Sequence, residues 1–193
     1  KDNEILVITD EIYSALCYSD YHSIAEHQDI KEKIIYVSGF SKMFSMTGLR
    51  VGYICAPKEI LKEIMKVHQY NVSCATSISQ YAALEGLRSS MEDVAYMKEV
   101  FRERRDFVYN KLIGLGFQCN LPEGAFYVFP SIKSFNMKSE EFCDDLLYNG
   151  KVACVPGTAF GSKGEGFIRI SYSYSKEELQ KGFNRIEKWL DKK

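Results

Sequence analysis

The order of apolar and polar residues divides the first part of the chain into short runs and longer periodic stretches. Continuous apolar runs of strand length predict buried strands, while apolar residues that recur every three or four positions predict helices with one packed face. Strands are expected at 5–8, 34–37 and 49–56. Helices are expected from Pro57 onward, over 78–87 and over 91–115.

Beyond residue 117 the same pattern predicts further strands and helices. Strands are expected at 125–129, 151–155 and 167–172, and helices over 139–150 and from 176 to near the end. Ser139 and Ser175 stand where helix N-caps are expected. This alternation indicates an α+β layer, and the long helix over 91–115 suits a connection between domains. We expect three parts, which cover 1–90, 91–116 and 117–193.

Composition narrows the class of protein. The chain has 193 residues, 46% of them hydrophobic, which is enough for a sizeable core. Its net charge of −1 provides no basic face, so we expect neither nucleic acid nor a membrane as a partner. The six cysteines form no C-x-x-C pair and no zinc spacing, which indicates reduced thiols, no metal site and a cytoplasmic location.

One lysine stands out because it lies between two predicted core strands. Lys42 belongs to the string Ser38-Gly39-Phe40-Ser41-Lys42, and Arg50 follows eight residues later. A partly desolvated lysine has a lowered pKa and can attack a carbonyl to form an imine, while a guanidinium suits a phosphate. Taken alone, the string is more typical of a solvated loop lysine.

A second string, upstream of Lys42, supplies further functional groups. The strand at 5–8 runs into Thr9-Asp10-Glu11-Ile12-Tyr13, which supplies a carboxylate and a phenol. The cofactor that uses a lysine imine, an anchored phosphate and a carboxylate on a pyridinium nitrogen is pyridoxal phosphate. With D-E-x-Y and S-x-x-S-K-x(7)-R patterns in this order, the sequence resembles the class I/II aminotransferases of fold type I, of the aspartate and aromatic aminotransferase kind.

The resemblance implies a role for each residue. Lys42 would hold pyridoxal phosphate as a Schiff base and move the substrate's α-proton. Asp10 would keep the ring nitrogen protonated and Tyr13 would hydrogen-bond the ring oxygen. Arg50 would anchor the phosphate together with Ser38 or Ser41. Many relatives have serine where this chain has Gly39, so which hydroxyl reaches the phosphate stays open, and we favour Ser41.

Arg169 is a further candidate, in the string Phe167-Ile168-Arg169-Ile170-Ser171. An arginine in an apolar strand should pair with a buried carboxylate or face a cleft that receives one, although an edge strand could also expose it. By resemblance, Arg169 would bind the α-carboxylate of the substrate through a bidentate pair of hydrogen bonds.

The resemblance covers residues 5–190 and implies the carboxyl-terminal half of a longer α/β protein. The chain would hold part of the large domain, with a mixed sheet, followed by an α+β small domain. We expect amino transfer between an L-amino acid and a 2-oxo acid in a full-length homodimer, and an inactive fragment when the chain is alone. A pyridoxal-phosphate-dependent carbon–sulfur β-lyase and the aminotransferase-like effector domain of a transcription regulator are the alternatives, and the side-chain preference stays open.

Overall fold

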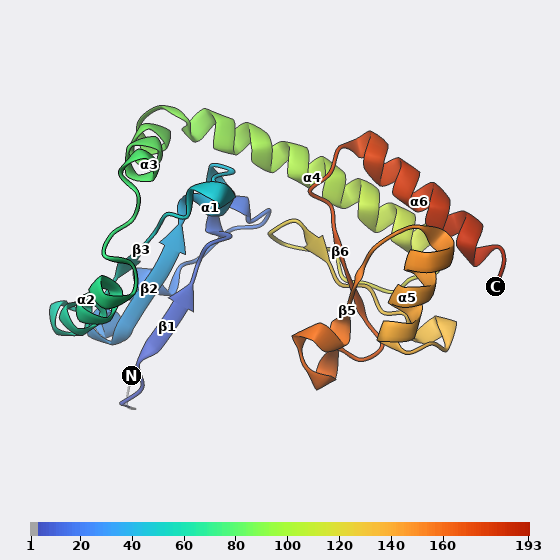
Figure 1. Ribbon diagram of the computed structural model, residues 1–193, viewed down its shortest axis with the longest axis horizontal. Coiled ribbons are helices and arrows are strands. Elements are labelled where there is room, and N and C mark those ends of the chain that lie inside the picture. The colour runs from blue at the N-terminus through green and yellow to red at the C-terminus, as the bar shows by residue number, and fades with distance from the viewer. Residues whose placement is uncertain (1–3) are drawn as a thin grey trace. The chain divides into compact units, whose positions relative to one another are not determined.

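A computed structural model describes residues 4–193. The chain forms two compact units, Lys1–Lys98 and Glu99–Lys193. The division falls inside the long helix α4 (Met91–Gly114), which matches the helix predicted over 91–115 (Figure 1). The finer division at 90 and 116 stays a prediction.

The first unit is built on a mixed three-stranded sheet. Its strands are β1 (Val7–Asp10), β2 (Ile34–Gly39) and β3 (Gly52–Cys55), in the order β1-β2-β3. β1 pairs with β2 in parallel, and β3 pairs with β2 antiparallel. The three predicted strands are therefore present, although the first lies two residues later than expected.

Helices join and follow these strands (Figure 1). Three short 3₁₀ helices lie between β1 and β2, at Ser14–Leu16, Ile24–Glu26 and Gln28–Lys33. Between β2 and β3 lie α1 (Phe40–Met43) and a 3₁₀ helix, Thr47–Leu49. The longer helices α2 (Lys58–Val72) and α3 (Ser77–Ser89) come next. Pro57 is the N-cap of α2 rather than its first helical residue.

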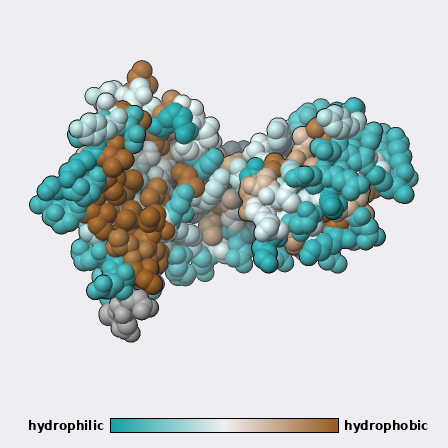
Figure 2. Space-filling view, turned by 60° about the horizontal axis from the view of Figure 1, so that its bottom comes forward, coloured by the Kyte–Doolittle hydropathy of each residue, from teal (hydrophilic) through white to brown (hydrophobic). Residues whose placement is uncertain are grey.

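The strands of this sheet, which the apolar runs predicted to be buried in the whole protein, are only partly covered in this chain. All four residues of β3 are exposed, and Ile8 in β1 keeps 70% of its surface accessible. A broad hydrophobic area is visible on one side of the molecule in Figure 2, and the exposed apolar residues of the first unit include Ile5, Leu6 and Ile8. An apolar run predicts that a strand is covered by other parts of a protein. Within the first unit, few side chains cover the sheet.

The second unit contains an antiparallel sheet with helices against it. Its strands are β4 (Tyr127–Val128), β5 (Val155–Pro156) and β6 (Ile168–Ser171), in the order β4-β6-β5. The helices are α5 (Ser139–Gly150) and α6 (Lys176–Leu190), with short 3₁₀ helices at Lys133–Phe135, Gly157–Phe160 and Ser162–Gly164. β4 and β5 are shorter than the strands predicted at 125–129 and 151–155.

A single core holds the second unit together. Phe142 and Leu146 of α5 are fully buried, and Phe183 and Trp189 of α6 are nearly so. The Phe142 and Trp189 rings meet edge to face with centroids 5.0 Å apart. The three-four spacing of apolar residues along α5 and α6 thus marks the faces that pack together.

Of the two predicted serine caps, one is confirmed. The Ser175 hydroxyl accepts a hydrogen bond from the Glu178 amide at the start of α6. Ser139 is not a cap: its buried hydroxyl accepts from the Gly166 amide at 2.8 Å, and its own amide donates to the Glu165 carboxylate at 2.9 Å. That hydrogen bond lowers the pKa of Glu165, so a carboxylate from a distant loop caps α5.

Two glycines in this unit bring backbone segments into direct contact. A Cβ atom on Gly157 would collide with the Gly164 carbonyl oxygen, and a Cβ atom on Gly164 would collide with Gly157. Only glycine allows this approach, which fixes the turn after β5 against the loop that leads to β6.

Candidate active site

The ends of three strands meet at one edge of the first sheet. Because β1 and β2 are parallel, their carboxyl ends at Asp10 and Gly39 lie at the same edge. β3 runs in the opposite direction, so its first residue, Gly52, pairs with Gly39 at that edge. The topology therefore brings the loops that carry Asp10, Lys42 and Arg50 to one end of the sheet.

Lys42 lies in the helical turn α1, directly after β2, and not in the irregular loop that the sequence predicted. Its side chain is half-buried. The Nζ atom lies 5.7 Å from the centroid of the Tyr13 ring. The lysine amine and the phenol ring, which the sequence placed in separate strings, are neighbours in the fold.

Gly39 occupies a position where a larger residue does not fit. A Cβ atom there would lie 3.0 Å from the Gly52 Cα and 3.1 Å from the Val51 carbonyl oxygen. A Cβ atom on Gly52 would lie 2.9 Å from the Ser38 carbonyl oxygen. The close pairing of β2 and β3 at this point therefore favours glycine at position 39.

Arg50 is held in an unusual backbone conformation. Its φ and ψ of 51° and 50° are left-handed, which costs a non-glycine residue about 1 kcal/mol or more. Two hydrogen bonds secure the turn: Arg50 Nη1 donates to the Thr47 carbonyl at 2.8 Å, and the buried Ser79 hydroxyl donates to the Leu49 carbonyl at 2.6 Å. The bond to Thr47 holds the guanidinium group beside the turn that carries it, and the Arg50 residue is exposed.

Asp10 and Tyr13 belong to the connection that leaves β1. Asp10 is exposed, and its Oδ1 accepts a hydrogen bond from the Ile12 amide at 3.1 Å. Tyr13 is half-buried and precedes the 3₁₀ helix Ser14–Leu16, which packs against α1. The carboxylate, the phenol and the lysine thus belong to adjoining connections.

The two candidate serines differ in their partners. The Ser38 hydroxyl donates to the Glu11 carbonyl oxygen at 3.3 Å, which ties the end of β2 to the end of β1. Ser41 lies in α1, one residue before Lys42, and is half-buried. A hydroxyl already engaged with the backbone is the weaker candidate for a phosphate ligand.

Arg169 lies in the second unit, where its strand β6 pairs with β5. Its guanidinium carbon lies 4.5 Å from the Tyr127 ring centroid and 4.7 Å from that of Phe160. Among residues 4–193 it forms no ion pair, so the buried carboxylate considered as its partner is not found. Aromatic faces instead hold the cation in a fixed position.

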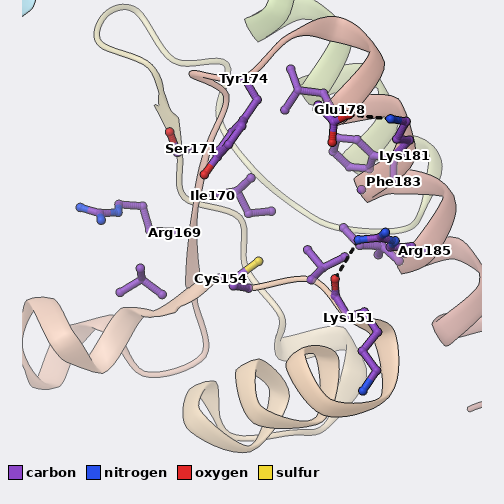
Figure 3. Close-up of a pocket in the computed structure, with 16 residues that line it drawn as sticks. Lys151, Cys154, Arg169, Ile170, Ser171, Tyr174, Glu178, Lys181, Phe183 and Arg185 are labelled. Carbon is purple, nitrogen blue, oxygen red and sulfur yellow. Dashed lines mark hydrogen bonds and ion pairs between the residues drawn. The ribbon is translucent and has the colours of Figure 1, made fainter.

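A cavity of about 310 Å³ lies beside the same strand (Figure 3). Its wall includes Cys154 just before β5, Ile170 from β6 and Phe183 from α6. The Arg169 side chain extends away from the other labelled residues, whereas Lys181 pairs with Glu178 and Arg185 donates to the Lys151 carbonyl (Figure 3). Arg169 is itself one of the residues that line the cavity.

Two residues of the site were not predicted from the sequence. Glu11 was read only as part of the acidic string, and Ser79 was given no role in the site. In the structure Val7, Thr9 and Glu11 lie on the more buried side of β1 and its continuation, but the sequence alone does not show which side is covered.

Between residues 4 and 193, no three His, Cys, Asp or Glu side chains gather as a metal site would require. In the same range no helix is both long and apolar enough to cross a membrane.

Comparison with known proteins identifies the family. The family model for aminotransferase class I and II matches residues 1–186, so the chain belongs to this family, whose cofactor is pyridoxal phosphate. The fold agrees: the crystal structure of an aromatic aminotransferase from Pyrococcus horikoshii OT3 superposes with a TM-score of 0.93 at 39% identity, over 97% of this chain and 51% of the other.

Individual relatives carry several related names. The putative aminotransferase YugH of Bacillus subtilis is 47% identical over 193 residues, which are all of this chain and 50% of the relative. The probable N-acetyl-LL-diaminopimelate aminotransferase of the same organism is also 47% identical, and an aspartate aminotransferase of Pyrococcus abyssi is 41% identical. The chain spans about half the length of the curated relatives it matches.

Proposed function

We propose that the full-length protein transfers an amino group between an L-amino acid and a 2-oxo acid, with Lys42 as the residue that carries pyridoxal phosphate. The observation on which this rests is the half-buried Lys42 amine beside the Tyr13 ring, at the sheet edge where β1 and β2 end. A primary amine in such a place is suited to react with an aldehyde.

The donor set at this edge fits the cofactor. Lys42 offers an amine for the aldehyde, Arg50 and Ser41 offer donors for the phosphate, and Asp10 offers a carboxylate for the ring nitrogen. When bound, pyridoxal phosphate supplies an electron sink for the substrate's α-carbon. Tyr13, held beside Lys42, would donate a hydrogen bond to the ring oxygen.

Lys42 would also move a proton. Its Nζ atom, once released, is the base positioned to accept the proton from the substrate's Cα and to return it during transfer. Arg169 would bind the substrate carboxylate, since the Tyr127 and Phe160 faces fix the plane of its guanidinium group.

The chain is proposed to be the carboxyl-terminal half of a longer, cytoplasmic, homodimeric enzyme. Its first unit would then be part of the large domain and its second unit the small domain, with 91–116 as the connecting helix. The exposed apolar residues of the first unit support this proposal, because such a surface is normally covered. Sequencing the whole reading frame should add a segment of similar length on the amino side. Added length on the carboxyl side would overturn this placement.

The proposed activity is tested by trapping the cofactor. The full-length protein is incubated with pyridoxal phosphate, reduced with borohydride and digested, and the modified peptide should contain Lys42. Modification of another lysine would contradict the assignment. Keto-acid-dependent amino transfer is expected, and pyruvate release from cystathionine without amino transfer would instead indicate a carbon–sulfur β-lyase. The chain alone is expected to bind the cofactor weakly and to show no turnover.

A further inference from the structure

Glu11 is the one charged residue among residues 4–193 that is buried, with 5% of its surface exposed. A carboxylate in such a place lowers stability unless hydrogen bonds replace its lost hydration. It lies between Asp10 and Ile12 in the sequence, next to one of the proposed cofactor ligands. Its burial therefore calls for a role that an apolar residue at this position would not fill.

The side chain of Glu11 joins two segments of the first unit. Its Oε1 atom accepts hydrogen bonds from the Thr9 hydroxyl at 3.1 Å and from the Ser23 hydroxyl at 2.9 Å. Its Oε2 atom is also buried and accepts no hydrogen bond of normal geometry from a described residue. The pKa of the neighbouring Tyr21 phenol is raised, first by partial burial and then by this carboxylate.

The backbone of Glu11 is fixed as well. Its amide donates to the Val37 carbonyl at 2.9 Å, which extends the pairing of β1 with β2 by one residue. Its carbonyl accepts from the Ser14 amide at 3.1 Å and from the Ser38 hydroxyl at 3.3 Å. One residue thus connects the end of β1, the turn after Tyr13 and the end of β2.

We propose that Glu11 is a positioning residue, whose buried carboxylate and backbone hold Asp10, Tyr13 and the turn of Lys42 in their places at the sheet edge. Thr9 and Glu11 are both anchored, so Asp10 between them has little freedom. The Ser38 hydroxyl donates to the Glu11 carbonyl, and this bond fixes the end of β2, four residues before Lys42. The proposal deepens the proposed function, since it concerns the site where the cofactor would be held.

The first test needs no cofactor. Hydrogen exchange of the chain is measured for Glu11→Ala and for a matched variant, Glu26→Ala, because Glu26 also bonds to Ser23 but is exposed. Glu11→Ala should speed exchange over 38–44 roughly tenfold, while Glu26→Ala should change only the segment around 23–27. Unchanged exchange over 38–44 in Glu11→Ala would overturn the proposal.

Two milder variants keep the test decisive if Glu11→Ala unfolds the first unit. Glu11→Gln retains an acceptor oxygen for Thr9 and Ser23 and should keep exchange over 38–44 within about twofold of the parent. Thr9→Val removes one donor at almost constant shape and should speed exchange over the same segment. Exchange over 38–44 in Thr9→Val that equals the parent's would contradict the proposal. So would exchange in Glu11→Gln that is as fast as in Glu11→Ala.

A second measurement uses the full-length protein. In Glu11→Ala the affinity for pyridoxal phosphate should fall roughly tenfold, Glu11→Gln should restore most of it, and Glu26→Ala should not change it. An affinity unchanged in Glu11→Ala would overturn the positioning role. If the cofactor is trapped on a lysine other than Lys42, the proposed function fails, yet the exchange results still decide whether Glu11 orders the segment over 38–44.

Discussion

The Lys42 ammonium lies 5.7 Å from the centroid of the Tyr13 ring, and the two residues come from connections that leave different strands of one parallel pair. This contact joins two strings that are separate in the sequence. It also places a phenol, which can donate a hydrogen bond, within reach of the groups that would surround the lysine amine. The chemistry of the proposed site begins with this pair.

Replacing Lys42 by alanine should abolish amino transfer in the full-length protein. The change removes both the nucleophile and the proton carrier, and we expect kcat to fall at least about a thousandfold. Lys66→Ala is the control, because Lys66 is exposed and pairs with Glu63 on the same helix. If both variants kept comparable rates, another lysine would have to carry the reaction.

Arg169→Lys should weaken the binding of both the amino acid and the 2-oxo acid. Lysine keeps the charge but loses the planar pair of donors and the stacking on Tyr127 and Phe160, so KM should rise roughly ten- to a hundredfold, about 1–3 kcal/mol. Arg185→Lys, at an exposed position of α6, serves as the comparison and should leave KM unchanged. Equal KM values for the parent and Arg169→Lys would remove Arg169 from the substrate site.

Neighbouring leucines in α5 provide a matched test of the core. Leu146 is fully buried, whereas 42% of the Leu147 surface is exposed. Leu146→Ala should lower the free energy of unfolding by about 2–5 kcal/mol, and Leu147→Ala by less than about 1 kcal/mol. Urea titration followed by the fluorescence of Trp189, the chain's single tryptophan, reports on this unit. Similar losses in both variants would show that α5 packs through a different face.

Four of the six cysteines should separate into two groups on alkylation. Burial raises the pKa of Cys154 to about 12 and of Cys143 to about 11, so neither forms much thiolate between pH 7 and 9. Iodoacetamide should therefore modify the exposed Cys55 and Cys74 in the folded chain. Cys143 and Cys154 should stay unmodified until the chain unfolds. Mass spectrometry of the digested protein would identify the labelled residues, and early labelling of Cys143 would contradict its burial.

The sequence predicted much of the local structure because the relevant signals are local. The apolar spacing along α4 and α6 reflects packing of one helix face, so those helices were placed to within two residues. The Ser175 cap depends on four consecutive residues and was likewise predictable. Strand burial was not, because an apolar run does not reveal which parts of the chain cover it, as the exposed residues of β3 show.

The candidate site divides in the same way. Lys42, Asp10 and Tyr13 were found because each belongs to a short string with its own chemistry. Glu11 was missed because its role depends on Ser23 and Ser38, which lie far along the chain. Ser139 was assigned as a cap because its partners, Gly164 and Gly166, are equally remote. Contacts between distant segments leave no periodic trace in the sequence.

The touching backbones of Gly157 and Gly164 have a consequence for how this chain can change over time. Every other amino acid has a Cβ atom, so any missense codon at either position places an atom where the opposite backbone already lies. A compensating change at the second position cannot help, because it too would add an atom. In a saturation-mutagenesis library selected for folded protein, these two positions should retain only glycine and synonymous codons, whereas Gly114 and Gly182, which face open space, should tolerate alanine.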